Sequence, residues 1–109
     1  MSEATDRIRA HFQALGVREI IVPEWGSTIY STPVTLAERH RIYANAKSEN
    51  DYEVLAKILI TKAQDKDGKP LFTAEDRAVL LQKADSAVLI RVAAEIMSSA
   101  APPVAELKN

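Results

Sequence analysis

The sequence predicts an α+β fold that is predominantly helical, with one N-terminal β-hairpin packed on four or five short α-helices. Two β-prone runs lie close together before residue 33 and flank a Trp-Gly pair. After residue 35, apolar residues recur at helical spacing, and each such segment follows a residue of helix-capping type. A chain of 109 residues has the length of one domain. We therefore expect residues 1–101 to form a single compact domain and residues 102–109 a flexible C-terminal tail.

The first expected element is an amphipathic helix over residues 3–15. Ile8, Phe12 and Leu15 stand at positions i, i+4 and i+7, which places them on one face of a helix. Gly16 follows, and glycine commonly ends a helix in a left-handed conformation.

A β-hairpin is expected over residues 18–32. The runs 18–22 and 27–32 are rich in β-branched and hydroxyl residues, and Pro23 restricts the first run to an edge or an end. The connection Pro23-Glu-Trp-Gly26 is of hairpin length, with Gly26 expected at a positive φ. A lone hairpin is marginal in water, so this one must pack on the helices or pair with another chain.

The helical part is expected over residues 35–99. Thr35-Leu-Ala-Glu38 has the form of a capping box and predicts a helix to about Lys47. Asn50 is the expected cap of a second helix. The apolar stripe of that helix contains Tyr52, Leu55, Ala56, Leu59 and Ala63, widened by Val54, Ile58 and Ile60.

Two more helices are expected after the turn cluster Lys66-Asp-Gly-Lys-Pro70. Thr73 caps a helix that runs to about Lys83, and Asp85 or Ser86 caps the last helix. The inner stripe of the last helix contains Leu89, Val92, Ala93 and Ile96, and the helix is expected to end at Ala101-Pro-Pro103.

Composition excludes several classes of protein. The 14 basic and 15 acidic residues give a formal net charge of −1, which argues against a nucleic-acid binder. The sequence contains no cysteine, so disulfides, iron–sulfur clusters and thiolate zinc sites are excluded. No apolar run approaches the length of a membrane span, and the polar, acidic N-terminus is unlike a signal peptide.

No motif in the sequence indicates catalysis, a cofactor or a metal ion. Asp65-Lys-Asp67-Gly68 superficially resembles a calcium loop, but the register places alanine at the position of the bidentate ligand, so a plain turn is the better interpretation. His11 and His40 have no second ligand at helical spacing. The sequence therefore predicts a protein that is not an enzyme.

Five side chains are candidate contacts for a protein partner. Trp25 at the hairpin tip has two interpretations, a plug that fills the core and an exposed anchor for a partner, with Tyr30 beside it. The strand residues 20–22 could also extend the sheet of a partner. Ile60, Val88 and Ile90 are expected to point away from the main apolar faces of their helices and to line a partner groove or a surface for self-association.

Two phrases of the sequence resemble those of a known family. Val22-Pro-Glu-Trp-Gly26, followed by Tyr30 and Thr35-Leu-Ala-Glu-Arg39, is similar to the opening of the tail assembly chaperones of long-tailed, siphovirus-like bacteriophages and prophages. Asp67-Gly-Lys-Pro-Leu-Phe72, followed by acidic residues and a Leu-rich helix, resembles the second signature of that family. The resemblance runs from about Ile20 to Met97 and leaves out the segment 3–15.

This resemblance implies a non-enzymatic role in viral tail assembly. Members of the family bind the tape measure protein, a very long helical protein, and keep it soluble in the host bacterial cytoplasm until tail-tube subunits polymerise around it. They are absent from the mature virion. In many such phages a translational frameshift near the end of the gene gives a longer product that recruits tail-tube protein, and Lys108-Asn109 could be encoded by a slippery adenine run.

Two other functions stay open at this point. One is a structural component of the virion, at the head–tail junction or in the tail. The other is a small helical DNA-binding regulator, because short helices joined by tight turns can contain a helix-turn-helix. Against this second alternative, no predicted helix has a basic face free of acidic residues.

Overall fold

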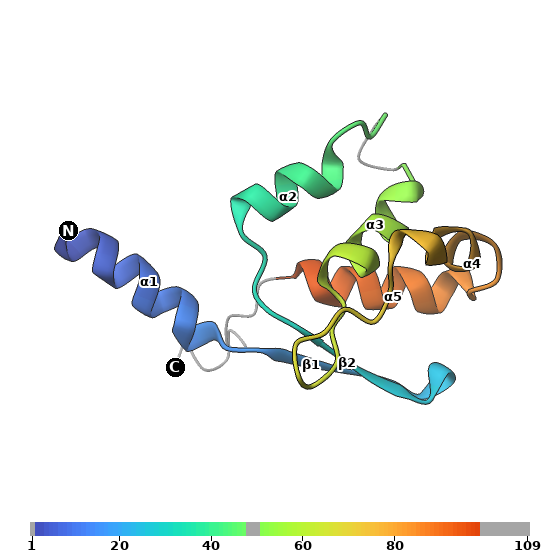
Figure 1. Cartoon of the computed structure of the whole chain (residues 1–109), viewed down its shortest axis with the longest axis horizontal. Helices are drawn as coiled ribbons and strands as arrows, with labels where there is room; N and C mark the ends of the chain where they lie inside the picture. The colour runs from blue at the N-terminus through green and yellow to red at the C-terminus, as the bar shows by residue number, and fades with distance from the viewer. Residues whose placement is uncertain (1, 48–50, 99–109) are drawn as a thin grey trace, which may run out of the picture.

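The computed structural model describes residues 2–47 and 51–98 of the chain. Within them it contains a two-stranded antiparallel hairpin and five α-helices, which confirms the predicted fold class (Figure 1). The elements are, in order, α1 (Glu3–Leu15), β1 (Arg18–Val22), the 3₁₀ turn η1 (Pro23–Trp25), β2 (Ser27–Ser31), α2 (Leu36–Tyr43), α3 (Glu53–Lys62), the 3₁₀ turn η2 (Ala74–Asp76), α4 (Arg77–Gln82) and α5 (Ser86–Met97).

The hairpin forms as its sequence predicts. Ile20 pairs with Ile29, and both side chains face the core. The connection is the 3₁₀ turn η1, and Gly26 ends it in the left-handed region at φ 60°. Gln64, far along the chain, extends the β2 edge through two backbone hydrogen bonds of 2.8 Å with Tyr30. The hairpin therefore does not stand alone, because a later loop also pairs with it.

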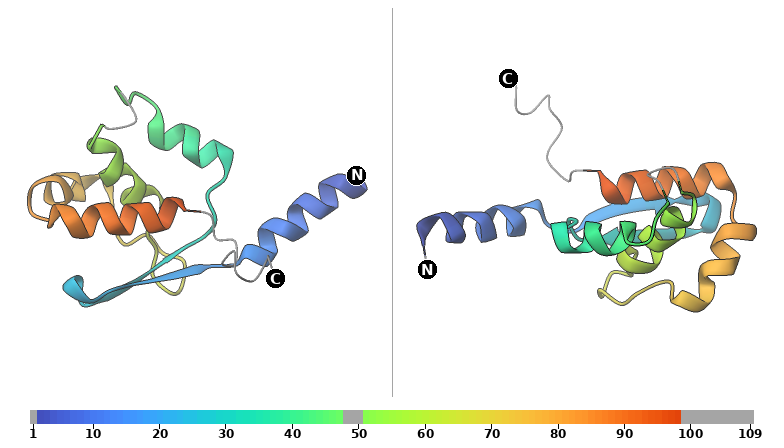
Figure 2. Two further views of the ribbon diagram at one scale, coloured as in Figure 1. Left: turned by 180° about the vertical axis from the view of Figure 1, so that it is seen from behind. Right: turned by 90° about the horizontal axis from the view of Figure 1, so that it is seen from above.

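The core lies between the hairpin and the helices α3 and α5. These two helices pack against each other, and α5 also packs against β1 (Figures 1 and 2). The inner stripe expected for the last helix is confirmed, since all four of its residues are buried. The buried apolar residues of the core are Ile20, Val22, Ile29, Ile42, Val54, Ala56, Ile58, Leu59, Ala63, Leu80, Val88, Leu89, Val92, Ala93 and Ile96.

Several helix boundaries follow from the predicted caps. Thr35 and Glu38 form a reciprocal capping box at the start of α2, and Asp85 caps α5 by accepting the backbone N–H of Ala87 at 2.9 Å. Thr73 also forms a capping box, but its first turn is the 3₁₀ turn η2 before α4 begins. Local hydrogen-bonding chemistry therefore placed the start of each of these helices.

Other boundaries differ from the prediction. Helix α2 ends at Tyr43, earlier than expected, and Asn45 then adopts a positive φ of 67°. The expected cap Asn50 lies outside the described residues, and the side chain of Asp51 instead accepts the backbone N–H of Glu53 at 3.0 Å. Tyr52 is outside α3 and 69% exposed, so its assignment to the buried stripe is wrong.

Helix α1 has the predicted bounds but no buried residue. It begins at the cap Ser2 and extends away from the body of the protein in every view (Figures 1 and 2). The prediction of one compact domain over residues 1–101 stays a prediction. The expected tail, 102–109, lies outside the described residues.

Candidate functional site

An open apolar groove lies between α3, α4 and α5. Its volume is about 490 Å³. Leu80 and Leu89, which line it, are buried, whereas Tyr52 and Ile90 are 69% and 52% exposed. The lining residues are Tyr52, Glu53, Leu55, Arg77, Leu80, Leu81, Gln82, Ala84, Ser86, Leu89 and Ile90. An exposed apolar groove of this kind is typical of a surface that receives side chains from a partner helix.

An ion pair forms part of the wall of this groove. Arg77 of α4 donates to the carboxylate of Glu53 of α3, with 2.5 Å between Nη2 and Oε1. Both side chains are about half exposed, so the pair contributes little to stability. It places one positive and one negative group beside the apolar floor, where each can meet a charge on a partner.

The structure separates the three side chains that were predicted to line a common surface. Ile90 lines the groove, as expected of an exposed apolar residue. Val88 is 5% exposed and belongs to the core, so the expectation that it points away from the main face of its helix is wrong. Ile60 is half-buried, packs against the core and is not among the lining residues of the groove.

Sequence reasoning missed two other lining residues. Leu55 and Leu81 lie in the groove, although periodicity alone makes them look like ordinary core positions. The groove itself depends on the gap between α3 and the short helix α4, which no local pattern predicts.

Trp25 is half-buried, so it fills part of the core, and its role as an anchor for a partner stays a prediction. Its ring packs partly against the core and meets Phe72 edge to face, with 6.4 Å between ring centroids and 79° between planes. The same ring lines a second hollow of about 290 Å³ together with Leu71 and Phe72. The structure therefore places Trp25 at the surface end of the core, where one part of the ring packs inside and another part remains accessible.

Tyr30 is engaged within the hairpin. Its hydroxyl donates to Glu19 Oε2 at 3.1 Å, and this hydrogen bond raises the pKa of Tyr30 above its ordinary value. The side chain is half-buried and lies across the sheet from Glu19. This hydrogen bond gives Tyr30 a structural role within the hairpin. Its contact with a partner stays a prediction.

The hairpin tip is tied to α5 by a bidentate ion pair. Arg91 donates to both carboxylate oxygens of Glu24, at 2.9 and 3.1 Å. The hydrogen bond from Arg91 and that from the backbone N–H of Glu24 lower the pKa of Glu24 to about 2. The pair fixes the tip, and Trp25 with it, over the N-terminal half of α5.

Comparison with known proteins gives one informative result. No model of a protein family matches the sequence, and no curated protein matches it. Among solved structures, the tail assembly chaperone of bacteriophage HK97 is similar, with a TM-score of 0.54 and 18% sequence identity. The match covers 77% of this chain and 85% of the HK97 chain. This protein has the fold of a phage tail assembly chaperone.

The likeness to the HK97 chaperone agrees with the two sequence phrases. The sequence predicted a hairpin followed by short helices, this chain has that arrangement, and most of it takes part in the structural match to the HK97 chaperone. At 18% identity the likeness establishes the fold. The resemblance in sequence and the likeness in structure thus agree on the fold.

Residues 2–47 and 51–98 contain no candidate metal centre. In those ranges no three His, Cys, Asp or Glu side chains lie close enough to hold a metal ion. The Asp65 carboxylate accepts the backbone N–H groups of Asp67 and Lys69, at 2.8 and 3.0 Å, and so closes the predicted turn. Among the described helices, none combines the length and the apolar character required to span a membrane.

Proposed function

We propose that this protein is a non-enzymatic phage tail assembly chaperone that binds the tape measure protein and keeps it soluble during tail assembly. The observation that carries the proposal is the fold shared with the HK97 tail assembly chaperone. The phrases around Trp25 and Gly68 support it, because they resemble the same family in sequence.

We assign the contact with the tape measure protein to the groove between α3, α4 and α5. A long helical protein carries apolar stripes along its length, and such a stripe fits a groove lined by Leu55, Leu81 and Leu89. The groove is small, so each contact is weak and reversible. Reversibility suits a chaperone whose place tail-tube subunits must later take.

Two of the five predicted contact residues lie where they can contact the tape measure protein. Ile90 lies in the groove, and Trp25 lines the second hollow beside Phe72. Tyr30 and Ile60 stay as predictions, since the first is bonded to Glu19 and the second packs against the core. Val88 is not proposed, because it is buried.

The remaining parts of the proposal concern cofactors, place and partners. The chaperone uses no cofactor, acts in the host bacterial cytoplasm and is absent from the mature virion. A longer, frameshifted product would bring tail-tube protein to the complex. The frameshift can be tested by reading the gene for an overlapping frame near Lys108. The absence of the chaperone from the virion can be tested by analysing the protein content of purified particles. Finding the protein in particles would favour a structural component instead.

The groove assignment predicts a selective effect of Ile90→Asp. We expect co-expression with the neighbouring tape measure gene to make the tape measure protein soluble, and Ile90→Asp to weaken binding at least about tenfold by placing a charge against the apolar stripe. Ile90 is 52% exposed, so the melting temperature should change little. The measurements are the soluble fraction of the tape measure protein and its co-purification with the chaperone.

Leu36→Asp is the matched control. Leu36 is 82% exposed on α2 and does not line the groove. This variant should keep the tape measure protein soluble. Equal loss of binding in both variants would contradict the groove assignment, and an insoluble tape measure protein in the presence of the unchanged chaperone would contradict the function.

A further inference from the structure

A third hollow joins the groove to the hollow beside Trp25. It has a volume of about 220 Å³ and lies against α4. Leu80 and Ala84 line both this third hollow and the groove, whereas Trp25 and Phe72 line both the third hollow and the second one. The three depressions therefore form one continuous surface, which we call the α4 surface. It runs from the groove past α4 to the hairpin tip, at the end of the molecule opposite α1 (Figures 1 and 2).

Exposed apolar side chains gather along the α4 surface. Val79 on α4 is 55% exposed, and Leu71, in the loop between α3 and η2, is 38% exposed. Tyr52 and Ile90 occupy the groove end. Among the described residues, four of the nine large apolar side chains that are exposed thus line this one surface. Exposed apolar residues that lie together mark an interaction site, whereas single scattered ones do not.

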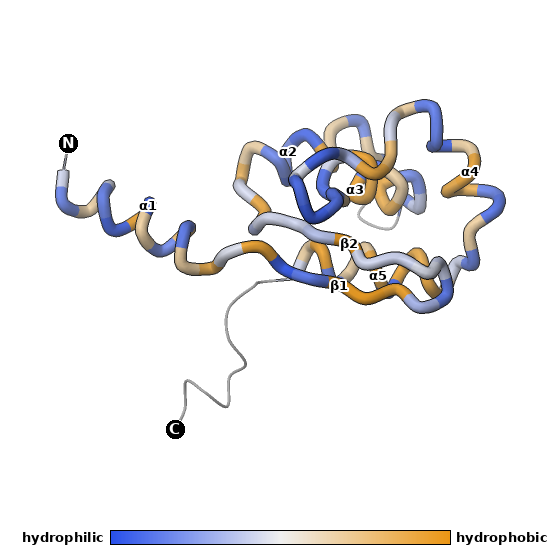
Figure 3. Tube along the Cα trace, turned by 60° about the horizontal axis from the view of Figure 1, so that its bottom comes forward, coloured by the Kyte–Doolittle hydropathy of each residue, from blue (hydrophilic) through white to orange (hydrophobic). Residues whose placement is uncertain are grey.

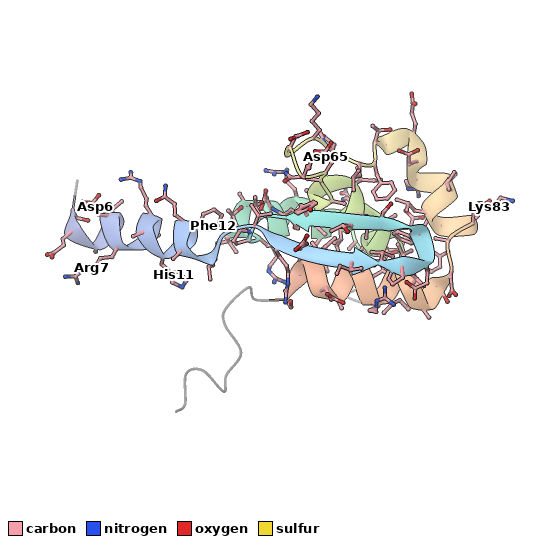
Figure 4. The ribbon with its side chains drawn as sticks, turned by 90° about the horizontal axis from the view of Figure 1, so that it is seen from below. Asp6, Arg7, His11, Phe12, Asp65 and Lys83 are labelled. Atoms are coloured by element: carbon pink, nitrogen blue, oxygen red, sulfur yellow. The ribbon has the colours of Figure 1, made fainter. Side chains whose placement is uncertain are left out.

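An exposed cation lies in the middle of the α4 surface. Lys83 lines the third hollow, and Figure 4 shows its side chain pointing away from the body of the protein. Within residues 2–47 and 51–98, its ammonium group has no ion pair or hydrogen bond. Asp85, the next charged residue along the chain, accepts the backbone N–H of Ala87, while Arg77 and Glu53 in the groove pair with each other. Lys83 is therefore available to a carboxylate on a partner.

The junction between the groove and the third hollow has a small side chain. Ala84 lines both depressions, is half-buried and presents only a methyl group. The distance between packed helices depends on the side chains at their contact, so a small residue lets a partner helix approach closely. A helix can therefore pass from one depression to the other without displacing a large side chain.

We propose that one helical segment of the tape measure protein crosses α4 and occupies the whole α4 surface, from Ile90 in the groove to Trp25 at the hairpin tip. This inference rests on the proposed function and adds the path and the composition of the bound segment. The segment carries two apolar clusters, one for each end of the surface, with an acidic residue between them that faces Lys83. Because both clusters belong to one segment, contact at one end raises the effective concentration of the other.

The test uses overlapping peptides of about 30 residues that cover the product of the neighbouring tape measure gene, each long enough for several helical turns. Fluorescence anisotropy measures their binding to the unchanged full chain and to two variants, Val79→Asp and Ile90→Asp. Each variant should weaken binding of the same peptides at least about tenfold. Both side chains are more than half exposed, so both variants should stay folded, which circular dichroism checks.

Two further variants test the middle of the path. Ala84→Phe places a ring at the junction and should weaken the same peptides about tenfold. Lys83→Glu changes an exposed side chain and so tests the path without disturbing the packing. It should weaken binding about threefold at low salt and less at high salt, because exposed charges are screened. Leu36→Asp, on α2, is the control and should bind every peptide as the unchanged protein does.

Four results would overturn the proposal. If Val79→Asp and Ile90→Asp weaken different peptides, the two ends bind separate segments. If Ile90→Asp alone weakens binding, the segment stops at the groove. If Lys83→Glu binds as the unchanged protein does at low salt, no acidic residue faces Lys83. If no peptide binds, or a peptide of scrambled order binds equally well, the surface does not select one helical segment.

None of these results contradicts the chaperone proposal itself. That proposal fails only if the full-length tape measure protein stays insoluble when it is co-expressed with the unchanged chaperone, which is a separate measurement.

Discussion

At the scale of single residues, Lys62 shows how a charge is accommodated in the interior. The residue is 1% exposed. Its ammonium donates to Glu38 Oε1 and Thr32 Oγ1, both at 2.8 Å, and to the carbonyl oxygen of Pro33 at 3.3 Å. The three donors of the ammonium are thus all paired. Burial raises the pKa of Glu38, but hydrogen bonds from Lys62 and from the Thr35 N–H outweigh this effect and hold the pKa below its ordinary value.

This network predicts unequal effects for its two charged members. Glu38→Ala leaves the Lys62 ammonium buried without its counter-ion and removes the capping box, so we expect a loss of about 3 kcal/mol in the free energy of unfolding. Lys62→Met replaces the ion with an apolar side chain of similar length and should cost less than about 1 kcal/mol. Urea denaturation measures the free energy of unfolding of both variants. Equal losses of that free energy would contradict this account of the pair.

The Glu24–Arg91 pair predicts a titration far into the acid range. The pKa of Glu24 is lowered from 4.5 to about 2. The stabilisation from the ion pair is therefore complete above pH 4.5 and is lost as the pH falls through 2. Arg91→Gln should return the pKa of Glu24 toward 4.5. The pKa of Glu24 in both proteins can be measured by following the carbon-13 NMR signal of its carboxyl group across the acid range. An unchanged pKa in the variant would show that Arg91 is not the cause.

At the scale of elements, the hairpin depends on its turn. Gly26 has φ 60°, a conformation that side chains with a Cβ rarely adopt, and a Cβ placed there would meet no atom within 4 Å. The cost of a substitution is therefore confined to the backbone. The sequence predicted this position, because the glycine follows a Pro-Glu-Trp run between two β-prone segments.

Gly26→Val should lower the free energy of unfolding by about 1–2 kcal/mol, whereas Gly26→Asn should cost less, because asparagine tolerates the left-handed region. Denaturant midpoints of the two variants give the comparison. If the valine and asparagine variants are equally stable, the positive φ is not what the glycine supplies.

Some helix boundaries could be predicted from neighbouring residues in the sequence, and others could not. The capping box at Thr35 and the helix cap at Thr73 were readable, since the groups that they bind lie within three residues. The end of α2 at Tyr43 and the exposure of Tyr52 were not, because both depend on how the segment between α2 and α3 turns. Apolar periodicity assigned Tyr52 and Val88 to the wrong environments, since it identifies a helix face and does not identify what that face meets.

At the scale of the whole molecule, the structure divides into a packed body and a projecting helix. Among the residues that the structure describes, every buried apolar residue lies after Val17. Helix α1 instead has a mixed hydropathy along its length (Figure 3). Stability should therefore be uneven along the chain, since local opening follows the number of buried contacts.

Hydrogen exchange should reveal this division. In dilute solution, the amides of α1 should exchange much faster than those of α3 and α5, because opening α1 exposes no buried side chain. Mass spectrometry of exchanged peptides measures both regions in one sample. Equal protection of α1 and α5 at the lowest concentration would show that α1 packs against its own chain.

The sequence by itself determined the fold class, the hairpin with its Gly26 turn and most of the helix starts. It also carried the resemblance to tail assembly chaperones that the HK97 fold matches. These features depend on residues close together in the chain, where propensity, capping and turn chemistry act directly. The tertiary structure alone decided that Val88 is core, that Lys62 is a buried ion and that α1 stands free. It also placed the groove between α3, α4 and α5. Each of these depends on which faces of distant elements meet, and spacing along one element does not contain that information.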